Sequence, residues 1–114
     1  MTVAAVIERD GQFLLVQERC GGRLVYNQQA GHLEDNESLL DAVIRETLEE
    51  TAWEFAPTSV IGVYRWRHPR NQVTFMRVGF AGQGTAHLPD RPLDTGIERV
   101  LWMDVDEIRE RRAE

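Results

Sequence analysis

Residues 31–53 read GHLEDNESLLDAVIRETLEETAW, and this stretch decides how the rest of the chain is interpreted. Its apolar residues recur at helical spacing, at Leu39, Leu40, Val43, Ile44 and Leu48. Thr47 lies on the same stripe, and a stripe of this kind predicts a helix that buries one face. We therefore expect a helix over Ser38–Thr51, with Asn36 as its N-cap. Glu37 would then lie near the positive end of the helix dipole.

Three glutamates share another face of this predicted helix. Glu46, Glu49 and Glu50 stand at positions i, i+3 and i+4, so at about 100° per residue they project within one sector. Carboxylates this close repel one another unless a cation lies between them, and Mg²⁺ prefers oxygen ligands. Most isolated acidic clusters are solvated helix faces, so spacing alone leaves both interpretations open.

Two neighbouring features favour a ligand site. Arg45 can reach both Asp41 and Glu49, one helical turn away on either side, and can hold carboxylates in a fixed geometry. The helix is also entered through Ala30-Gly31-His32-Leu33-Glu34, where a glycine lets the backbone approach a ligand closely.

With these positions in place, residues 31–53 resemble the signature of the Nudix hydrolase family, in which Gly, Glu and Arg-Glu-x-x-Glu-Glu stand at fixed spacings. The six matching positions are Gly31, Glu37, Arg45, Glu46, Glu49 and Glu50. Since each residue type has an abundance of a few per cent, chance agreement at one start position is on the order of 10⁻⁷. Two positions depart from the pattern. Thr47 stands where the family has an apolar residue, and Ala52 stands where it has a glycine after the helix.

The resemblance implies a fold of the α/β (α+β) class, a Nudix-like α/β/α sandwich with a mixed sheet and two helices. It also implies a Mg²⁺ or Mn²⁺ cofactor. The implied metal ligands are Glu46, Glu49, Glu50 and a backbone carbonyl of Ala30 or Gly31.

Catalytic roles also follow from the resemblance. Glu46 and Glu49 are implied as catalytic carboxylates, with Arg45 orienting them and Glu37 steadying the loop. Glu98, beside the last predicted strand, stands where some relatives place an additional acidic ligand or base. A surface glutamate near a turn is an equally good interpretation of Glu98.

The loop from Asn27 to Glu34, with Arg65-Trp66 and Phe75-Met76-Arg77, resembles the bacterial NudJ-type phosphatases of that family. This resemblance implies a broad hydrolase of nucleoside di- and triphosphates and of thiamine-type pyrophosphates. Relatives of this type usually continue past residue 114, so we expect part of the pocket wall to be missing here. The alternatives are a hydrolase of ADP-ribose or another nucleoside diphosphate derivative, and a non-catalytic Nudix-fold domain that binds a nucleotide.

Several residues outside the acidic helix face are candidates for substrate binding. Arg77 can direct its guanidinium at a phosphate, although an outward, solvated arginine is an equal alternative. Tyr26 and Trp66 can stack on a ring, but aromatic residues in short strands more often belong to the core. Gln28 and His32 belong to the loop that leads into the helix, where they can line the site.

The remainder of the chain alternates β-branched and aromatic runs with turn signals. We expect strands at Val3–Ile7, Phe13–Val16, Val60–Trp66, Val73–Phe80 and Val100–Met103, with a short stretch at Leu24–Tyr26. Asp10-Gly11 joins the first two strands as a hairpin, and residues 68–71 form a turn. A loop is expected over Asn27–Asn36.

Towards the C-terminus, Gly82 and Gly84 are expected to end a strand, and Pro89 to Thr95 to form a loop. Asp104 and Glu107 resemble a capping box that opens a short final helix.

Composition limits the classes of function. The chain has 114 residues and a formal net charge of −6, with no lysine, so we expect one domain over 1–114. An acidic surface repels long nucleic acids, so the expected partner is a small phosphorylated substrate. The protein is expected to be either a monomer or a homodimer. No apolar run reaches the ~18 residues of a membrane span, and the N-terminus does not resemble a secretory signal. Cys20 is the single cysteine, which excludes an intramolecular disulfide and fits a cytoplasmic protein.

Overall fold

The computed structural model describes residues 1–20, 22–28, 30–67 and 74–111. Their elements are β1 (Thr2–Arg9), β2 (Gln12–Cys20), β3 (Arg23–Asn27), β4 (Ala30–His32), α1 (Leu39–Thr51), β5 (Trp53–Arg67), β6 (Thr74–His87), β7 (Ile97–Asp104) and α2 (Val105–Arg111). The predicted turn over 68–71, the predicted strand residue Val73 and the side chain of Trp66 lie outside the described part of the chain.

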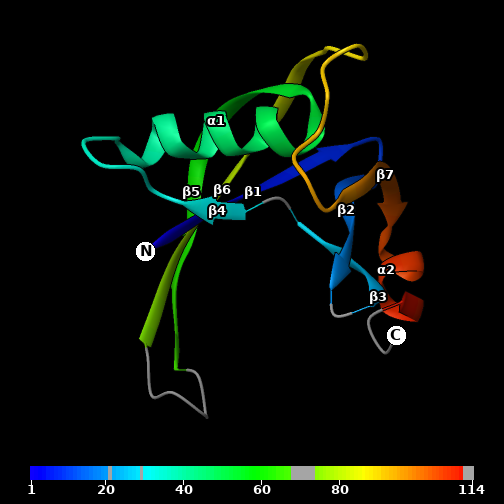
Figure 1. The fold of residues 1–114 in the computed structure, drawn as a ribbon, viewed down its shortest axis with the longest axis horizontal. Coiled ribbons are helices and arrows are strands. Elements are labelled where there is room, and N and C mark those ends of the chain that lie inside the picture. The colour runs from blue at the N-terminus through cyan, green and yellow to red at the C-terminus, as the bar shows by residue number, and fades with distance from the viewer. Residues whose placement is uncertain (21, 29, 68–73, 112–114) are drawn as a thin grey trace.

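The seven strands form one mixed sheet. Its main path runs β3-β2-β1-β6-β5, while β4 pairs with β1 and β7 pairs with β2. Strands β1 and β6 are parallel, and the other pairs are antiparallel. Figure 1 shows α1 lying across β5, β6 and β1, with α2 beside β7 at the other end of the sheet. The predicted mixed sheet with two helices is confirmed.

The two faces of β1 point towards different helices. Val3, Ala5 and Ile7 are buried and join the core beneath α1 with Ala42 and Val43. Val6 points to the opposite face because side chains alternate along a strand. There, Val6 and Phe13 line a pocket together with Ile108 of α2. The sheet therefore has one helix on each face, which is the expected α/β/α arrangement.

The predicted helix is confirmed, but its N-cap is Ser38 rather than Asn36. The Ser38 hydroxyl accepts a hydrogen bond from the amide of Asp41 at 3.1 Å, and its backbone is extended, as a cap requires. Asn36 has a φ of 64° and serves in the turn before the helix instead. The buried stripe is also narrower than expected, since Leu40 is 51% and Ile44 37% exposed.

Helix α1 ends at Ala52, the position where the family pattern has a glycine. Ala52 adopts the left-handed conformation, with φ 60°, and its amide donates to the carbonyl of Leu48 at 2.9 Å. A side chain in this conformation costs about 1–2 kcal/mol. The helix exit thus keeps the geometry that suits glycine and carries the strain of an alanine.

Strands β4, β5 and β6 differ most from the sequence expectation. Strand β5 begins at Trp53, directly after the helix exit, instead of at Val60, and it runs through Pro57. Strand β6 continues through Gly82 and Gly84 to His87, because these glycines leave room for β5. A Cβ at Gly84 would contact the Trp53 ring at 2.7 Å, so the glycines permit pairing where they were expected to end it. Strand β4 lies within the predicted loop 27–36, where it pairs with the start of β1.

The first hairpin and the final helix agree with the sequence. Strands β1 and β2 pair around Asp10-Gly11. At α2, the amide of Glu107 donates to Asp104 at 2.8 Å, and the amide of Asp104 donates to Glu107 at 3.3 Å. These reciprocal hydrogen bonds confirm the predicted capping box.

Substitutions of Thr47 test whether its hydroxyl or its methyl group contributes more to the stability of the fold. Thr47 is fully buried, and its hydroxyl donates to the Val43 carbonyl at 2.7 Å. We expect Thr47→Val to change the free energy of unfolding by less than about 1 kcal/mol, because that carbonyl also accepts the helix hydrogen bond. Thr47→Ser should lower it by about 1 kcal/mol, since it leaves a void. Urea unfolding without metal measures both, and a valine variant less stable than the serine variant would contradict this.

Candidate metal and substrate site

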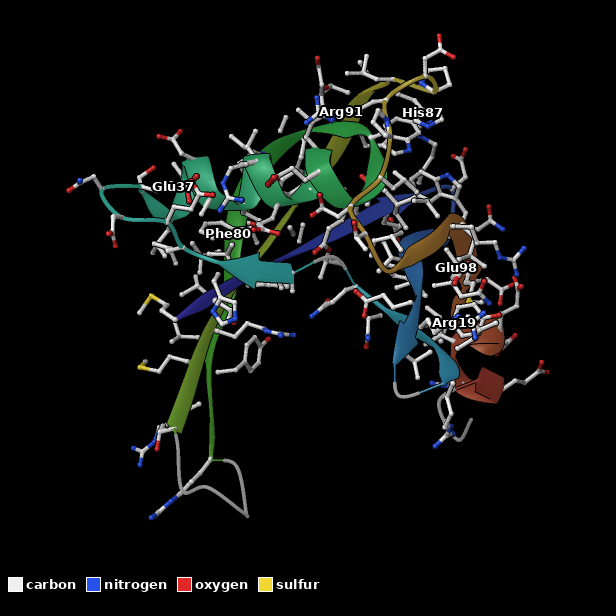
Figure 2. All side chains as sticks on the ribbon, in the orientation of Figure 1. Arg19, Glu37, Phe80, His87, Arg91 and Glu98 are labelled. Carbon is white, nitrogen blue, oxygen red and sulfur yellow. The ribbon has the colours of Figure 1, made fainter. Side chains whose placement is uncertain are left out.

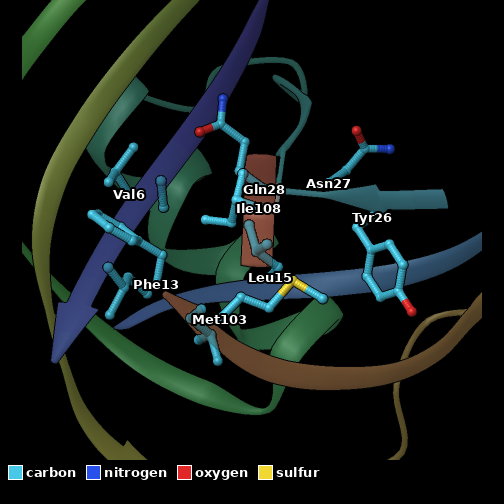
Figure 3. Close-up of a pocket in the computed structure, with 11 residues that line it drawn as sticks. Val6, Phe13, Leu15, Tyr26, Asn27, Gln28, Met103 and Ile108 are labelled. Atoms are coloured by element: carbon cyan, nitrogen blue, oxygen red, sulfur yellow. The ribbon is translucent and has the colours of Figure 1, made fainter. Parts of the chain in front are cut away.

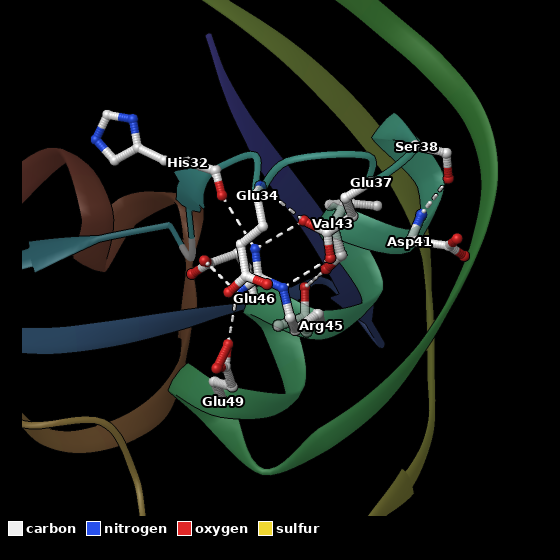
Figure 4. A network of polar contacts seen from close by, with 10 residues as sticks. His32, Glu34, Glu37, Ser38, Asp41, Val43, Arg45, Glu46 and Glu49 are labelled. Carbon is white, nitrogen blue, oxygen red and sulfur yellow. Dashed lines mark hydrogen bonds and ion pairs between the residues drawn. The ribbon is translucent and has the colours of Figure 1, made fainter.

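Arg45, in the middle of α1, is the centre of a network of carboxylates (Figure 4). Its Nε and Nη2 donate to the two oxygens of Glu37, at 2.7 and 2.9 Å. Its Nη1 donates to Glu46 at 2.8 Å and to Glu49 at 2.7 Å. Its Nη2 also donates to the His32 carbonyl at 3.0 Å. One side chain therefore ties the loop before the helix to the acidic helix face.

The network agrees only in part with the partners expected for Arg45. Glu49 is a partner, as the i,i+4 spacing predicts. Asp41 is not among the partners of Arg45, and its amide is capped by Ser38. Glu37 takes the place of Asp41, because the loop folds back over the first turn of the helix.

The same contacts shift the ionisation of the network. Hydrogen bonds from Arg45, and then from the Glu34 amide, lower the pKa of Glu37 to about 2. Contact with Glu37 raises the pKa of Arg45 above its ordinary value. Both groups are charged throughout the physiological range, so the contact between them is a permanent ion pair.

Glu46, Glu49 and Asp94 form a cluster of carboxylates that can hold a metal ion. One oxygen from each lies within 4.8 Å of the others. Asp94 comes from the loop between β6 and β7, and its amide donates to the Glu49 carbonyl at 3.0 Å. Sequence reasoning missed Asp94, because a single aspartate in a loop has no spacing that relates it to the helix.

Glu50 lies deeper than the cluster. It is only 9% exposed, and it accepts a hydrogen bond from the Ala30 amide at 3.1 Å. Burial raises its pKa to about 8, opposed by that amide and assisted by the charges of Glu46, Glu18 and Asp94. Burial also raises the pKa of Glu46. A bound cation would stabilise the charged forms of Glu46 and Glu50, so the buried carboxylates fit a metal site.

Gly31 places backbone directly against the acidic face. A Cβ at this position would overlap the carboxylate of Glu46. The glycine therefore permits an approach that any other residue would block. Its carbonyl stays a predicted metal ligand.

Two pockets meet at Asn27 and Gln28, directly after β3. An apolar one of about 300 Å³ lies between the sheet and α2 (Figure 3) and is lined by Ala5, Val6, Ile7, Phe13, Leu14, Leu15, Tyr26, Asn27, Gln28, Met103 and Ile108. A polar one of about 210 Å³ is lined by Glu18, Asn27, Gln28, Ala30 and Arg77. Tyr26, Gln28 and Arg77, three of the predicted substrate residues, thus line pockets that share Asn27 and Gln28.

Comparison with known proteins identifies the family. The model of the NUDIX domain matches residues 1–114. The chain belongs to the NUDIX family. It is 37% identical over 108 residues to Phosphatase NudJ of Escherichia coli, which covers 95% of this chain and 70% of that protein.

Solved structures agree. A NUDIX hydrolase from Nitrosomonas europaea superposes with a TM-score of 0.93 at 49% identity, covering 98% of this chain and 76% of that one. A UDP-X diphosphatase superposes with a TM-score of 0.79 at 18% identity, covering 93% and 51%, so its likeness concerns the fold alone.

Two residues suggested by the NUDIX pattern lie apart from the carboxylate cluster. Glu98 on β7 accepts a hydrogen bond from Arg19 at 3.0 Å, and both are labelled in Figure 2. It borders a pocket at the exit of α1, with Ala52 and His87. His32 is exposed and contributes its carbonyl to the Arg45 network. Their roles stay predictions.

Among the described residues, no helix has the length and apolar character that crossing a membrane requires.

Replacement of Arg45 by lysine separates the contribution of its charge to stability from the contribution of its hydrogen-bond geometry. Arg45→Lys keeps one charge but loses the paired hydrogen bonds, so we expect the free energy of unfolding to fall by about 2 kcal/mol. Arg23→Lys, at the exposed start of β3, is the matched control and should have little effect. Chemical denaturation measures both, and equal effects would contradict a special role for Arg45.

Glu37 should make the protein sensitive to acid. Its folded pKa of about 2 is below the ordinary value of 4.5, so its contribution to stability is present above pH 4.5 and is lost as the pH falls towards 2. We expect the stability advantage of the native protein over Glu37→Gln to shrink in that window. Thermal unfolding across pH measures it, and Arg45→Lys should flatten the dependence. An advantage that grew towards low pH would contradict the assignment.

Proposed function

We propose that this NUDIX protein is a metal-dependent hydrolase of phosphoanhydride bonds. Its substrates would be small pyrophosphates, namely nucleoside di- and triphosphates or thiamine-type pyrophosphates. The observation that carries the proposal is the meeting of Glu46, Glu49 and Asp94 within 4.8 Å, beside the buried Glu50. The proposed cofactor is Mg²⁺ or Mn²⁺, because hard cations take oxygen ligands.

The donor set fits such an ion. Three carboxylates converge from two separate elements, and Arg45 neutralises only the side of Glu46 and Glu49 that faces the loop. Glu46, Glu49, Asp94 and Glu50 would hold the ion, with the Gly31 carbonyl as a further ligand. When bound, a divalent ion neutralises phosphate oxygens and lowers the pKa of water.

The chain's own residues would orient the substrate. Arg77 would bind a phosphate at the polar pocket, and the apolar pocket beside Tyr26 and Gln28 would hold a flat ring. Arg45 would act as a positioning residue for Glu46 and Glu49. The base that takes a proton from water would be one of these glutamates or Glu98.

Similarity to Phosphatase NudJ supports the substrate class, since it extends over 95% of this chain. We include a cytoplasmic location in the proposal, supported by the single cysteine.

Turnover of a substrate panel tests the proposal. With Mg²⁺ or Mn²⁺, the protein should release phosphate or pyrophosphate from nucleoside triphosphates or thiamine pyrophosphate, and a chelator should abolish release. ADP-ribose, whose cleavage yields AMP and ribose 5-phosphate, tests the alternative substrate in the same panel. Glu46→Gln, Glu50→Gln and Asp94→Asn should each lose about 100-fold or more in kcat, because each removes a charged ligand. Glu8→Gln, an exposed carboxylate on β1, is the control.

Two results would contradict the proposal. Metal-independent binding of a nucleotide with no turnover across the panel would favour the non-catalytic binding domain. Near-normal turnover by Asp94→Asn in folded protein would remove Asp94 from the site.

A further inference from the structure

The polar pocket holds two opposite charges that do not neutralise each other. Glu18 and Arg77 both line it, yet they form no ion pair within the described chain. In the described part of the chain, the hydrogen bond that Arg77 donates goes to the Thr2 hydroxyl, at 3.3 Å. Arg19, the neighbour of Glu18, is paired with Glu98. The pocket therefore presents a ligand with one cation and one carboxylate that have no charged partner among the described residues.

Strand pairing and one hydrogen bond hold Glu18 at the wall of this pocket. Glu18 pairs with Val25 of β3 in regular register, and the unpaired residue at the register shift between β2 and β7 is Glu98 of β7. The Asn27 amide then donates to Glu18 Oε2 at 3.1 Å, which holds the carboxylate against the pocket wall. Asn27 binds one oxygen of Glu18, and no hydrogen bond to the other oxygen comes from the described residues.

The position of the pocket sets what part of a substrate meets Glu18. Asn27 and Gln28 line both this pocket and the apolar pocket. Ala30, which also lines this pocket, donates its amide to Glu50. The pocket thus lies between the place proposed for the ring and the proposed metal ligands. The negative charge of Glu18 also contributes to the raised pKa of Glu50.

We propose that Glu18 is a specificity-determining residue that accepts a hydrogen bond from an N–H or O–H group on the organic part of the substrate. This inference rests on the proposed function. A carboxylate repels phosphate, so the phosphate chain is directed to Arg77 and the metal face, and an uncharged donor faces Glu18. Two sources supply such a donor next to a pyrophosphate, namely an amino group on the ring and a ribose hydroxyl.

Paired nucleotides distinguish these sources. CTP has an amino group at C4 of the ring, where UTP has a carbonyl oxygen and an N–H at the neighbouring N3. CTP and dCTP differ in the 2′-hydroxyl, so CTP bears the donor in question in both pairs. In at least one pair, the native protein should favour the donor-bearing nucleotide by about tenfold in kcat/KM, because a site built for a donor rejects the analogue without it. Glu18→Gln should reduce that ratio to about twofold or less. The reduction should come from a lower kcat/KM for the donor-bearing nucleotide, with kcat/KM for the other nucleotide unchanged.

Asn27→Ala, which frees the Glu18 side chain, should reduce the same ratio in part. Glu8→Gln should leave every ratio unchanged and serves as the charge-matched control.

The outcomes separate the two proposals. Turnover without preference in either pair, or an equal loss by Glu18→Gln on all three nucleotides, overturns the role of Glu18 and leaves the hydrolase intact. Absence of turnover with any metal overturns the hydrolase. In that case, affinities measured by titration calorimetry in Ca²⁺ still test Glu18, since the same ratios apply to binding. A protein that binds none of the three nucleotides overturns both.

Discussion

The site depends on one guanidinium placed among carboxylates that would otherwise repel one another. Arg45 binds Glu37, Glu46 and Glu49 at 2.7 to 2.9 Å, and through the His32 carbonyl it also holds the strand that carries Gly31. Since a guanidinium donates along several fixed directions, one residue can satisfy all of these acceptors. The loop, the helix face and the backbone next to Glu46 are therefore positioned together.

A second constraint acts at the other end of α1. The left-handed Ala52 turns the chain directly into β5, and its carbonyl accepts from the Leu88 amide at 2.8 Å. The amide of Asp94 donates to the Glu49 carbonyl one turn earlier. The carbonyls at the helix end thus hold both ends of the loop between β6 and β7. This attachment brings a carboxylate from late in the sequence to the acidic face.

The pockets arise because β1 changes partner along its length. Near its end, it pairs with β2 at Glu8 and Arg9, whereas at its start it pairs with the short strand β4. The chain crosses from β3 to β4 between these two regions, so Asn27 and Gln28 border both pockets. A substrate that extended from the apolar pocket to the carboxylate cluster would pass Glu18 and Arg77 on the way.

What the sequence determined by itself is local and periodic. Helical spacing predicted α1 and the shared face of Glu46 and Glu49, and the capping box predicted α2, because 3.6 residues per turn fix which side chains are neighbours. Tertiary structure decided what spacing cannot encode. The short strand β4, the continuation of β6 past its glycines, and the places of Asp94 and Glu18 all depend on pairing between segments far apart in the chain. Such pairing is set by how the sheet closes around its core, which no short stretch of sequence contains.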